Sequence, residues 1–369
     1  MKTPNERFYP LIPAGGVGSR LWPLSRAQAP KFLLDLTGNG SSLLRQTYDR
    51  LLDLSSGSVM VVTGEDHQKA VMQQLDQLAA QDLVLEPSPR DSAAAIGLAC
   101  AILYSRDPDA IIGSFAADHV IDPVAEFHQV VREAIETAAS GKIVTIGITP
   151  TEPSTAFGYI KATEPLGLAK APSALAVESF VEKPDYATAS AYVASGEYTW
   201  NAGMFVAPAE LMLSHLKANQ PKLYEGITQL AQAWGGPRQA ELMQQIWPRL
   251  PKIAIDYAVA EPAAAAGDVA MVPGSFSWDD VGDFDAVARL NQEKTDEKLT
   301  LLGDRENILS QDATGLISSG SGRKISVVGL EDIVVIDTDD ALLVTSRSQA
   351  QRVKDTVGQL KELGLTQLL

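Results

Sequence analysis

The stretch Leu11–Leu33, LIPAGGVGSRLWPLSRAQAPKFL, joins an apolar run to a glycine-rich loop. The apolar residues Phe8 to Ile12 predict a buried strand that stops where the glycines begin. Glycine permits positive φ and has no Cβ, so consecutive backbone N–H groups can approach an anion closely. The stretch therefore predicts a phosphate-binding loop after a strand, with a nucleotide phosphate as its guest.

Two cations accompany the glycines. Arg20 lies inside the loop and Lys31 follows eleven residues later. Pro23 and Pro30 restrict the backbone of the segment between the two cations, so both cations can contact the same phosphates.

Counting residues excludes two commoner glycine motifs. A dinucleotide-binding fingerprint that starts at Gly16 needs a glycine at position 21, which is Leu21, and the chain has no GxxxxGK[ST] phosphate loop. The remaining alternative is a tight strand-to-helix turn that binds nothing.

Composition narrows the class of protein. The chain has 369 residues, 45% of them hydrophobic, which suffices for one large domain and a smaller one. Its formal charge of −16 and pI near 4.7 argue against binding nucleic acid or an anionic membrane, both of which require a basic surface. A single cysteine, Cys100, and the lack of a signal peptide or an apolar span of ~18 residues predict a cytoplasmic protein.

Strand-like and helical runs alternate over the first 150 residues, which predicts an α/β fold. The expected strands after the first are 59–63, 83–85, 111–112 and 143–148, and the expected helices are 44–52, 67–80, 93–104 and 127–138. This alternation is typical of a parallel sheet covered by helices on both faces. Ligands of such sheets bind beyond the carboxyl ends of the strands, where the glycine loop lies.

The alternation loosens beyond residue 149, with helices expected over 186–195, 210–218 and 222–234. The polar segment 291–298, NQEKTDEK, is the best candidate for a linker. We therefore predict a catalytic domain over residues 1–292 and a small β-rich domain over residues 299–369. The small domain has expected strands at 315–318, 325–328, 333–338 and 341–345, compatible with one or two rungs of a β-helix.

A final helix is predicted over residues 347–363. Its apolar face carries Val353, Val357, Leu360 and Leu363. Packing onto the neighbouring strands is one use of this face, and self-association is the alternative. We expect a homodimer.

The glycine-rich segment resembles the signature of the sugar-phosphate nucleotidyltransferases, and Leu21–Ser25, LWPLS, is similar to the mannose-1-phosphate guanylyltransferase version of it. The resemblance implies a Rossmann-like, GT-A-like mixed sheet, mainly parallel, with helices on both faces and a β-helix-like C-terminal domain. It also implies that Arg20 and Lys31 are catalytic and neutralise the departing pyrophosphate. The residues implied to hold the nucleotide here are Ala14, Gly15, Gly16, Gly18 and Ser19.

Two aspartates are candidate metal ligands. Asp118 ends the strand-like run IIGSFAADHV, and Asp280 follows about 160 residues later in FSWDDVG. Mg²⁺ is usually held by one or two carboxylates together with phosphate oxygens and water. Both segments look like the family's magnesium-binding motifs, which implies catalytic Asp118 and Asp280 with Mg²⁺ as cofactor. Capping of a following helix is the alternative for Asp118, and Asp279 is the rival second ligand.

The segment Glu86–Ile96, EPSPRDSAAAI, follows a predicted strand and opens a helix that Asp91 or Ser92 can cap. It is similar to the guanylyltransferase segment that contacts the base. The residues implied to bind the nucleotide in this segment are Glu86, Arg90, Asp91 and Ser92. A carboxylate at position 91 can accept from guanine N1–H and the exocyclic amine.

Three further motifs resemble the family's sugar-phosphate site. They are AFGYI around Gly158, VEKPD with Glu182 and Lys183, and WNAGMF with Asn201. An ammonium before a proline suits a monoester phosphate, and carboxylate and amide groups suit sugar hydroxyls. Without the resemblance, Gly158 could be a strand bulge and the Glu182–Lys183 pair a solvated surface pair. Asp256, in IDYAV, is expected to support the site from behind.

The resemblance implies transfer of GMP from GTP to α-D-mannose 1-phosphate, which gives GDP-mannose and diphosphate. The sugar phosphate would attack the α-phosphorus directly. Two alternatives stay open: another hexose-1-phosphate nucleotidyltransferase, and a regulatory homologue that binds sugar nucleotides without catalysis.

Overall fold

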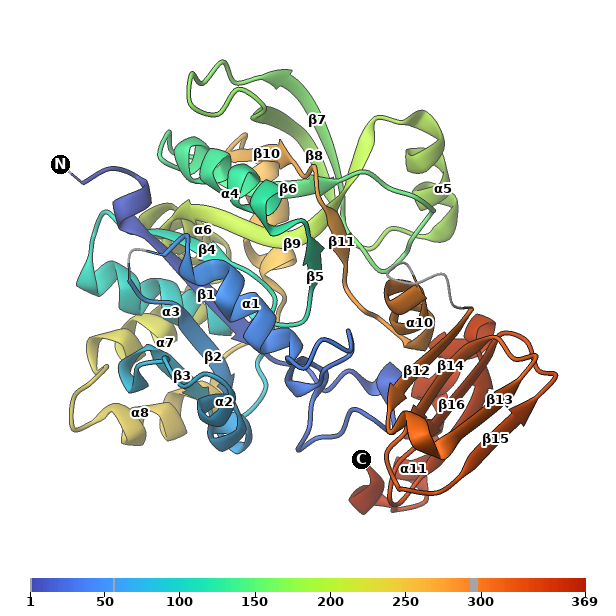
Figure 1. Cartoon of the computed structure of the whole chain (residues 1–369). Coiled ribbons are helices and arrows are strands. Elements are labelled where there is room, and N and C mark those ends of the chain that lie inside the picture. Colours follow the sequence, from blue (N-terminus) through green and yellow to red (C-terminus); the bar gives the residue numbers. More distant parts are fainter. Residues whose placement is uncertain (1, 56, 293–297) are drawn as a thin grey trace. The chain divides into compact units, whose positions relative to one another are not determined.

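The computed structural model describes residues 2–55, 57–292 and 298–369, and the chain forms two compact units (Figure 1). Unit 1 comprises Met1–Gly15, Thr47–Ala117 and Ile121–Trp278, and unit 2 comprises Gly16–Gln46, Asp118–Val120 and Asp279–Leu369. The chain passes between the units within α1 (Leu43–Leu52), β5 (Val120–Asp122) and β11 (Ser277–Asp279). The predicted linker largely falls on residues 293–297, outside the described residues, so the predicted domain boundaries stay a prediction.

Unit 1 is built on a nine-stranded sheet in the order β3-β2-β1-β4-β9-β6-β10-β8-β7. Its strands are β1 (Phe8–Ala14), β2 (Met60–Gly64), β3 (Leu83–Glu86), β4 (Ile111–Ser114), β6 (Ile143–Ile148), β7 (Tyr159–Pro165), β8 (Leu175–Val181), β9 (Tyr198–Pro208) and β10 (Val269–Pro273). The pairs among β3, β2, β1 and β4 are parallel, as is the pair β6–β10, whereas β8 and β9 run against their neighbours. The prediction of a mixed, mainly parallel sheet is confirmed.

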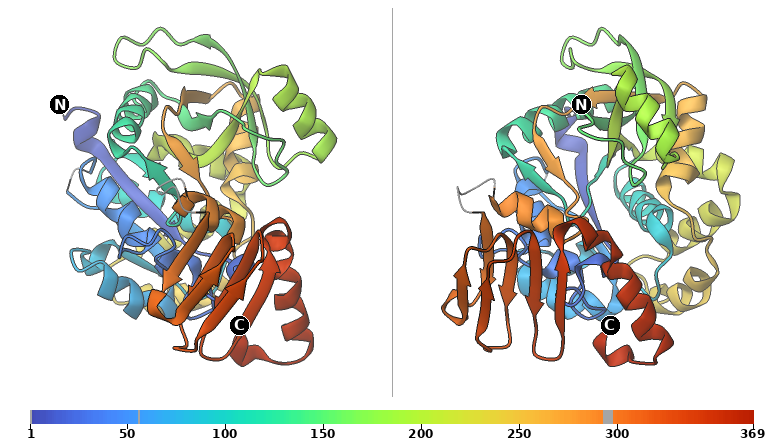
Figure 2. Two further views of the ribbon diagram at one scale, coloured as in Figure 1. Left: turned by 45° about the vertical axis from the view of Figure 1, so that its right-hand side comes forward. Right: turned by 90° about the vertical axis from the view of Figure 1, so that its right-hand side faces the viewer.

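Helices cover both faces of this sheet, as predicted. Figure 2 shows α4 on one face and α3, α6 and α7 on the other. The helices of unit 1 are α2 (Gln68–Gln74), α3 (Asp91–Arg106), α4 (Val124–Ala138), α5 (Tyr186–Ser195), α6 (Ala209–Asn219), α7 (Pro221–Gln232), α8 (Gln239–Ile246) and α9 (Glu261–Ala265). Residues 93–103 of α3 are all buried, because the helix lies between the sheet and α6 and α7. The α2 helix ends at Gln74, six residues before its predicted end.

Unit 2 contains short parallel strands stacked as the coils of a β-helix (Figures 1 and 2). Its elements are α10 (Phe284–Gln292), β12 (Leu299–Gly303), β13 (Ile308–Gln311), β14 (Gly315–Ser319), β15 (Ile325–Val328), β16 (Ile333–Asp337), β17 (Leu342–Ser346) and α11 (Val353–Glu362). Parallel pairing joins β12 to β14, β14 to β16, and β13 to β15, while β17 returns antiparallel to β16. Gly315 has φ +125°, and a Cβ there would collide with the backbone of Ile333 in the next coil. The β-helix-like domain is confirmed; β12 and β13 were not predicted.

The core of unit 2 is drawn from three separate stretches of the chain. They contribute Leu21 and Leu43, then Phe284 and Val287, and finally the set Leu316, Val334, Ile336, Leu343, Ala350 and Val353. The predicted final helix begins as a 3-10 turn, Arg347–Arg352, before α11. Its Val357 and Leu360 pack against this core, whereas Leu363 is 71% exposed. Most of the predicted apolar face is therefore covered inside the unit.

Within the described part of the chain, no helix combines the length and the apolarity that crossing a membrane requires.

Candidate active site

The glycine loop leaves β1 at Ala14 and closes on itself in unit 2. Gly16 and Gly18 adopt the left-handed conformation, with φ of 82° and 75°. The Lys31 N–H donates to the Val17 carbonyl over 3.1 Å, which brings the end of the excursion back to its start. A Cβ on Gly18 would lie 2.6 Å from the Lys31 Cβ, so glycine is needed there to let the lysine stem pass.

Lys31 brings the two predicted metal ligands together. It is only 7% exposed, and its Nζ donates to Asp118 Oδ2 over 2.7 Å. The same Nζ donates to the main-chain carbonyl of Asp280. Asp118 lies beyond the end of β4, in the turn before β5, so it cannot cap a helix as the alternative interpretation supposed.

The two carboxyls differ in electrostatics. Burial alone would raise the pKa of Asp118, but the Lys31 ammonium, with a smaller effect of His119, brings it below its ordinary value. The pKa of Asp280 is raised, first by burial and then by the neighbouring Asp279, Asp118 and Asp283, against the opposing effect of Lys31. One ammonium therefore does not compensate the carboxylates gathered here.

Asp279, the rival ligand, is engaged in holding the loop. Its Oδ1 accepts from the Val281 N–H over 2.7 Å, and its Oδ2 pairs with Arg289 Nη1 over 2.7 Å. Val281 has φ 47° although it is β-branched, and it is fully buried. Such a conformation persists only where the surroundings enforce it. Asp280 therefore remains the proposed ligand.

Ser19 and Arg20 lie in a 3-10 turn, Ser19–Leu21, directly after Gly18. The Nε of Arg20 is buried and has no hydrogen-bond partner among the described residues. A buried donor of this kind costs free energy unless it meets an acceptor. An anion held by the loop would supply one.

The predicted base-binding segment lies in unit 1, between β3 and α3. Burial raises the pKa of the Glu86 carboxyl to about 7. Asp91 is left-handed, with φ 65°, and its Oδ1 accepts from the Ser92 N–H over 2.9 Å. Neither predicted residue caps α3: Arg90 occupies the N-cap position and its side chain makes no cap hydrogen bond, while the Ser92 hydroxyl accepts from the Ile255 N–H over 2.8 Å.

A segment that sequence reasoning overlooked packs against this one. The Trp247 indole N–H donates to the Ser88 carbonyl over 2.7 Å. The Arg90 guanidinium donates to the carbonyls of Pro248 and, over 3.3 Å, Leu250. Arg90 thus ties the base segment to residues 248–250. No sequence motif marked this partner, because both acceptors are main-chain carbonyls.

The predicted sugar-phosphate segments also meet inside unit 1. A Cβ on Gly158 would collide with Glu182 Oε2, so glycine makes room for that carboxylate. Glu182 is 9% exposed; its Oε1 accepts from Lys183 Nζ, while Oε2 is buried with no partner in the described part of the chain. Burial opposes the charge of Lys183, but the Glu182 carboxylate outweighs it and raises the pKa of the lysine. The ammonium stays charged, and its side chain is half exposed.

Asn201 is held on three sides. Its Oδ1 accepts from Thr145 Oγ1 over 2.8 Å and from the Gly203 N–H over 3.1 Å, and its Nδ2 donates to Asp256 Oδ1 over 3.0 Å. Burial and the nearby Glu182 raise the pKa of Asp256 to about 6. Asp256 supports Asn201 as expected, and it opens a π-helical turn, Asp256–Ala260. Little of the amide is left for a ligand except one N–H.

The predicted site residues thus form two groups. Unit 2 holds Gly16, Gly18, Ser19, Arg20, Lys31, Asp118 and Asp280, and unit 1 holds Ala14, Gly15, Glu86, Arg90, Asp91, Ser92, Gly158, Glu182, Lys183 and Asn201. Within unit 1, the Ile255 N–H donates to the Ser92 hydroxyl, and the carboxylate of the next residue, Asp256, accepts from the Asn201 amide. These two neighbouring residues therefore join the base segment to the sugar-phosphate segment.

The carboxylates of unit 2 suit a metal that takes few protein ligands. Within residues 2–55, 57–292 and 298–369, no three His, Cys, Asp or Glu side chains are arranged to enclose an ion. Mg²⁺ needs no such cage, because phosphate oxygens and water complete its octahedron. Asp118 and Asp280 fit this requirement.

Two families match the sequence. Residues 9–297 match the nucleotidyl transferase family, and residues 306–360 match the mannose-phosphate isomerase/GMP-like β-helix domain.

Similar proteins cover nearly the whole chain. The xanthan biosynthesis protein XanB of Xanthomonas campestris is 38% identical over 361 residues, covering 96% of this chain and 73% of its own. A mannose-1-phosphate guanylyltransferase of Escherichia coli is 37% identical over 364 residues, which cover 97% of this chain and 74% of the relative's own length. A crystal structure from Thermus thermophilus, titled a mannose-1-phosphate geranyltransferase, has a TM-score of 0.83 at 30% identity and covers 96% of this chain and 99% of that one.

Proposed function

Given that the chain belongs to the nucleotidyl transferase family, we propose that it transfers GMP from GTP to α-D-mannose 1-phosphate, forming GDP-mannose and diphosphate. The relatives whose names carry the guanylyltransferase activity support this choice of substrates. A sensor that only binds sugar nucleotides would not need the cations around a leaving group.

The observation that carries the proposal is the position of the Lys31 ammonium. It contacts Asp118 and the Asp280 main chain, although these residues lie 87 and 249 positions away in the sequence. A cation fixed between two carboxylate-bearing loops beside a glycine loop is the arrangement that nucleotidyl transfer requires, because charge must be compensated on both metal and phosphates.

Mg²⁺ is the proposed cofactor, with Asp118 and Asp280 as its protein ligands. The depressed pKa of Asp118 keeps that carboxylate ionised and ready to bind a cation. The pKa of Asp280 is raised first by burial and then by neighbouring negative charge, which a divalent ion would offset. When bound, the metal would withdraw charge from the reacting phosphates.

The chain's own groups do the rest by position and charge. The attacking oxygen of a sugar phosphate is already ionised, so no strong general base is needed. The loop N–H groups, Arg20 and Lys31 hold the triphosphate and stabilise the diphosphate that leaves. Lys183 holds the phosphate of the sugar, and Glu182 accepts from its hydroxyls. Glu86 and Asp91 are the proposed acceptors for the guanine N–H groups.

The test is incubation of the purified chain with GTP, mannose 1-phosphate and Mg²⁺, with diphosphate release and GDP-mannose formation as the readouts. A panel of other nucleoside triphosphates and hexose 1-phosphates separates this activity from that of a related transferase. Absence of diphosphate with every pair would overturn the proposal and favour a binding protein.

Lys183→Ala should raise the Michaelis constant for mannose 1-phosphate by about tenfold or more while changing that for GTP much less, because a charge-assisted contact to one substrate is lost. Steady-state kinetics with each substrate varied in turn measures the split. Lys161→Ala is the matched control, since Lys161 lies in the same unit and, among the residues that the structure describes, pairs only with Glu178 and Glu197 at the surface. Equal increases for both substrates would contradict the role given to Lys183.

A further inference from the structure

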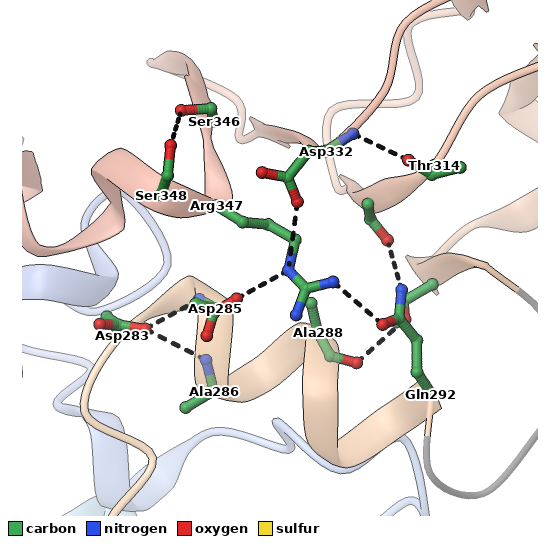
Figure 3. A network of polar contacts seen from close by, with 12 residues as sticks. Asp283, Asp285, Ala286, Ala288, Gln292, Thr314, Asp332, Ser346, Arg347 and Ser348 are labelled. Carbon is green, nitrogen blue, oxygen red and sulfur yellow. Dashed lines mark hydrogen bonds and ion pairs between the residues drawn. The ribbon is translucent and has the colours of Figure 1, made fainter. Parts of the chain in front are cut away.

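Arg347 connects the β-helix to α10, the helix that follows the Asp280 loop. Its Nε lies 2.7 Å from Asp285 Oδ1 and 3.7 Å from Asp332 Oδ1, and its Nη1 donates to Gln292 Oε1 over 3.1 Å (Figure 3). Asp285 lies in the first turn of α10 and Gln292 is its last residue. The forked guanidinium of Arg347 therefore contacts both ends of α10.

A second contact from the same 3-10 turn reaches the start of α10. Asp283 is 7% exposed, and its Oδ1 accepts from the N–H groups of Asp285 and Ala286 over 2.8 and 3.1 Å (Figure 3). Its Oδ2 accepts from the side-chain amide of Gln351. The carboxylate that begins the helix is thus itself held by the C-terminal part of the chain.

The distance along the chain from this contact to the proposed metal ligand is short. Only Val281 and Gly282 separate Asp280 from Asp283. Val281 is fully buried in the core that also contains Phe284 and Val287 of α10. Because this segment has little freedom to flex, a shift of α10 would be passed on to Asp280.

We propose that Arg347 is a positioning residue for metal binding, which sets the place of Asp280 by holding α10 against the β-helix. The inference rests on the proposed function, in which Asp280 binds the metal. It assigns the C-terminal domain a part in the reaction: its turn Arg347–Arg352 supports the loop that carries the proposed metal ligand.

The experiment compares Arg347→Ala with the wild-type protein in two assays. Binding of Mn²⁺ in the presence of GTP is measured by electron paramagnetic resonance of the free ion. The affinity should fall by about tenfold, the lower end of the loss expected when a group that holds a metal ligand is removed. The Mg²⁺ concentration that gives half the maximal rate should rise by a similar factor, and the Michaelis constant for mannose 1-phosphate should stay unchanged. Arg347→Lys keeps the charge but not the fork, so its values should lie between.

Arg352→Ala is the matched control. Arg352 lies in the same turn, is 75% exposed on its side chain, and contacts only its near neighbours Gln349 and Asp355 in the described structure. It should behave as the wild type in both assays. The double variant Arg347→Ala, Asp285→Ala should bind the metal no more weakly than the poorer single variant, because both substitutions remove the same contact.

Unchanged metal binding in Arg347→Ala, with or without a lower unfolding temperature, would show a purely structural role and overturn the inference. If that variant does not fold, the comparison of Arg347→Lys with wild type decides in the same way. The Mn²⁺ assay does not need turnover, so failure of the proposed reaction in the wild type would be seen separately.

Discussion

Lys31 joins the loops of the proposed active site because it is a buried cation with acidic neighbours. Its ammonium is the meeting point of the Asp118 and Asp280 segments, and its stem passes over Gly18. Removing a carboxylate from beside a buried ammonium leaves its charge uncompensated, which costs more than losing a surface pair. Substitutions at these positions should therefore be chosen to keep shape while removing charge.

Asp118→Asn should nearly abolish diphosphate release and leave the fold intact, because the amide keeps the shape of the side chain but is a poor metal ligand. Diphosphate release and the thermal unfolding temperature measure the two effects. A residual rate above about a tenth of wild type would remove Asp118 from the metal site.

Glu86→Gln should stabilise the protein at pH 8 and have little effect near pH 4.5. The fold raises the pKa of this carboxyl to about 7, so the wild type loses stability as pH rises from about 4.5 through 7, where the ionised form becomes costly to bury. The gain should reach about 1–3 kcal/mol in urea unfolding at pH 8. Glu164→Gln, at an exposed position of β7, controls for loss of one negative charge. The same gain at both pH values would show that burial of the charge is not the cause.

The glycine loop shows that residues of one type can be required for different reasons. Gly16 and Gly18 are both left-handed, but only Gly18 lies against Lys31; no atom of the described chain lies within 4 Å of a Cβ placed on Gly16. Because Gly16 has no side chain, the backbone there stays accessible, as a phosphate-binding loop requires. Gly18 leaves space for a side chain of the same loop.

Alanine at the two positions should separate these reasons. Both variants should lose about 1 kcal/mol from the left-handed backbone. Gly18→Ala should lose more stability and more catalytic rate, because its Cβ would displace Lys31. Chemical unfolding and diphosphate release measure the difference. Equal losses in stability would show that Lys31 relaxes without cost.

The buried core of unit 2 combines residues that lie far apart in the sequence. Leu21 and Leu43 come from the region after the glycine loop, and Phe284 comes from α10. The C-terminal coils also contribute to that core, for example with Val334. The loops of the proposed active site and the β-helix therefore bury one another's apolar surface.

Removal of residues 299–369 should give an insoluble or inactive protein, because the truncated chain would expose the apolar residues that the coils cover. Expression of residues 1–292, with size-exclusion chromatography and the diphosphate assay, tests this. Wild-type activity in the truncated chain would show that the catalytic domain is independent of the coils.

Much of the fold could be read from local patterns. Strand β6 and helix α5 have their predicted bounds, and Ser42 accepts from the Arg45 N–H at the start of α1. These features depend on periodicity, β-branched residues and capping groups that are neighbours in the chain. The β12 and β13 strands were missed because short parallel strands gain their stability from stacking between coils.

The candidate site, like the fold, could be predicted from the sequence only in part. The glycine loop, the cations and the aspartates stood out by residue type and spacing. Two contacts could not be recognised in this way: the hydrogen bond from Lys31 to the Asp280 carbonyl and the ion pair of Arg347 with Asp285 of α10. Each joins a side chain to a main-chain group or to a side chain that only folding brings near. Residue type indicates what a group can bind, but its partner is set by packing between distant segments, which leaves no local pattern in the chain.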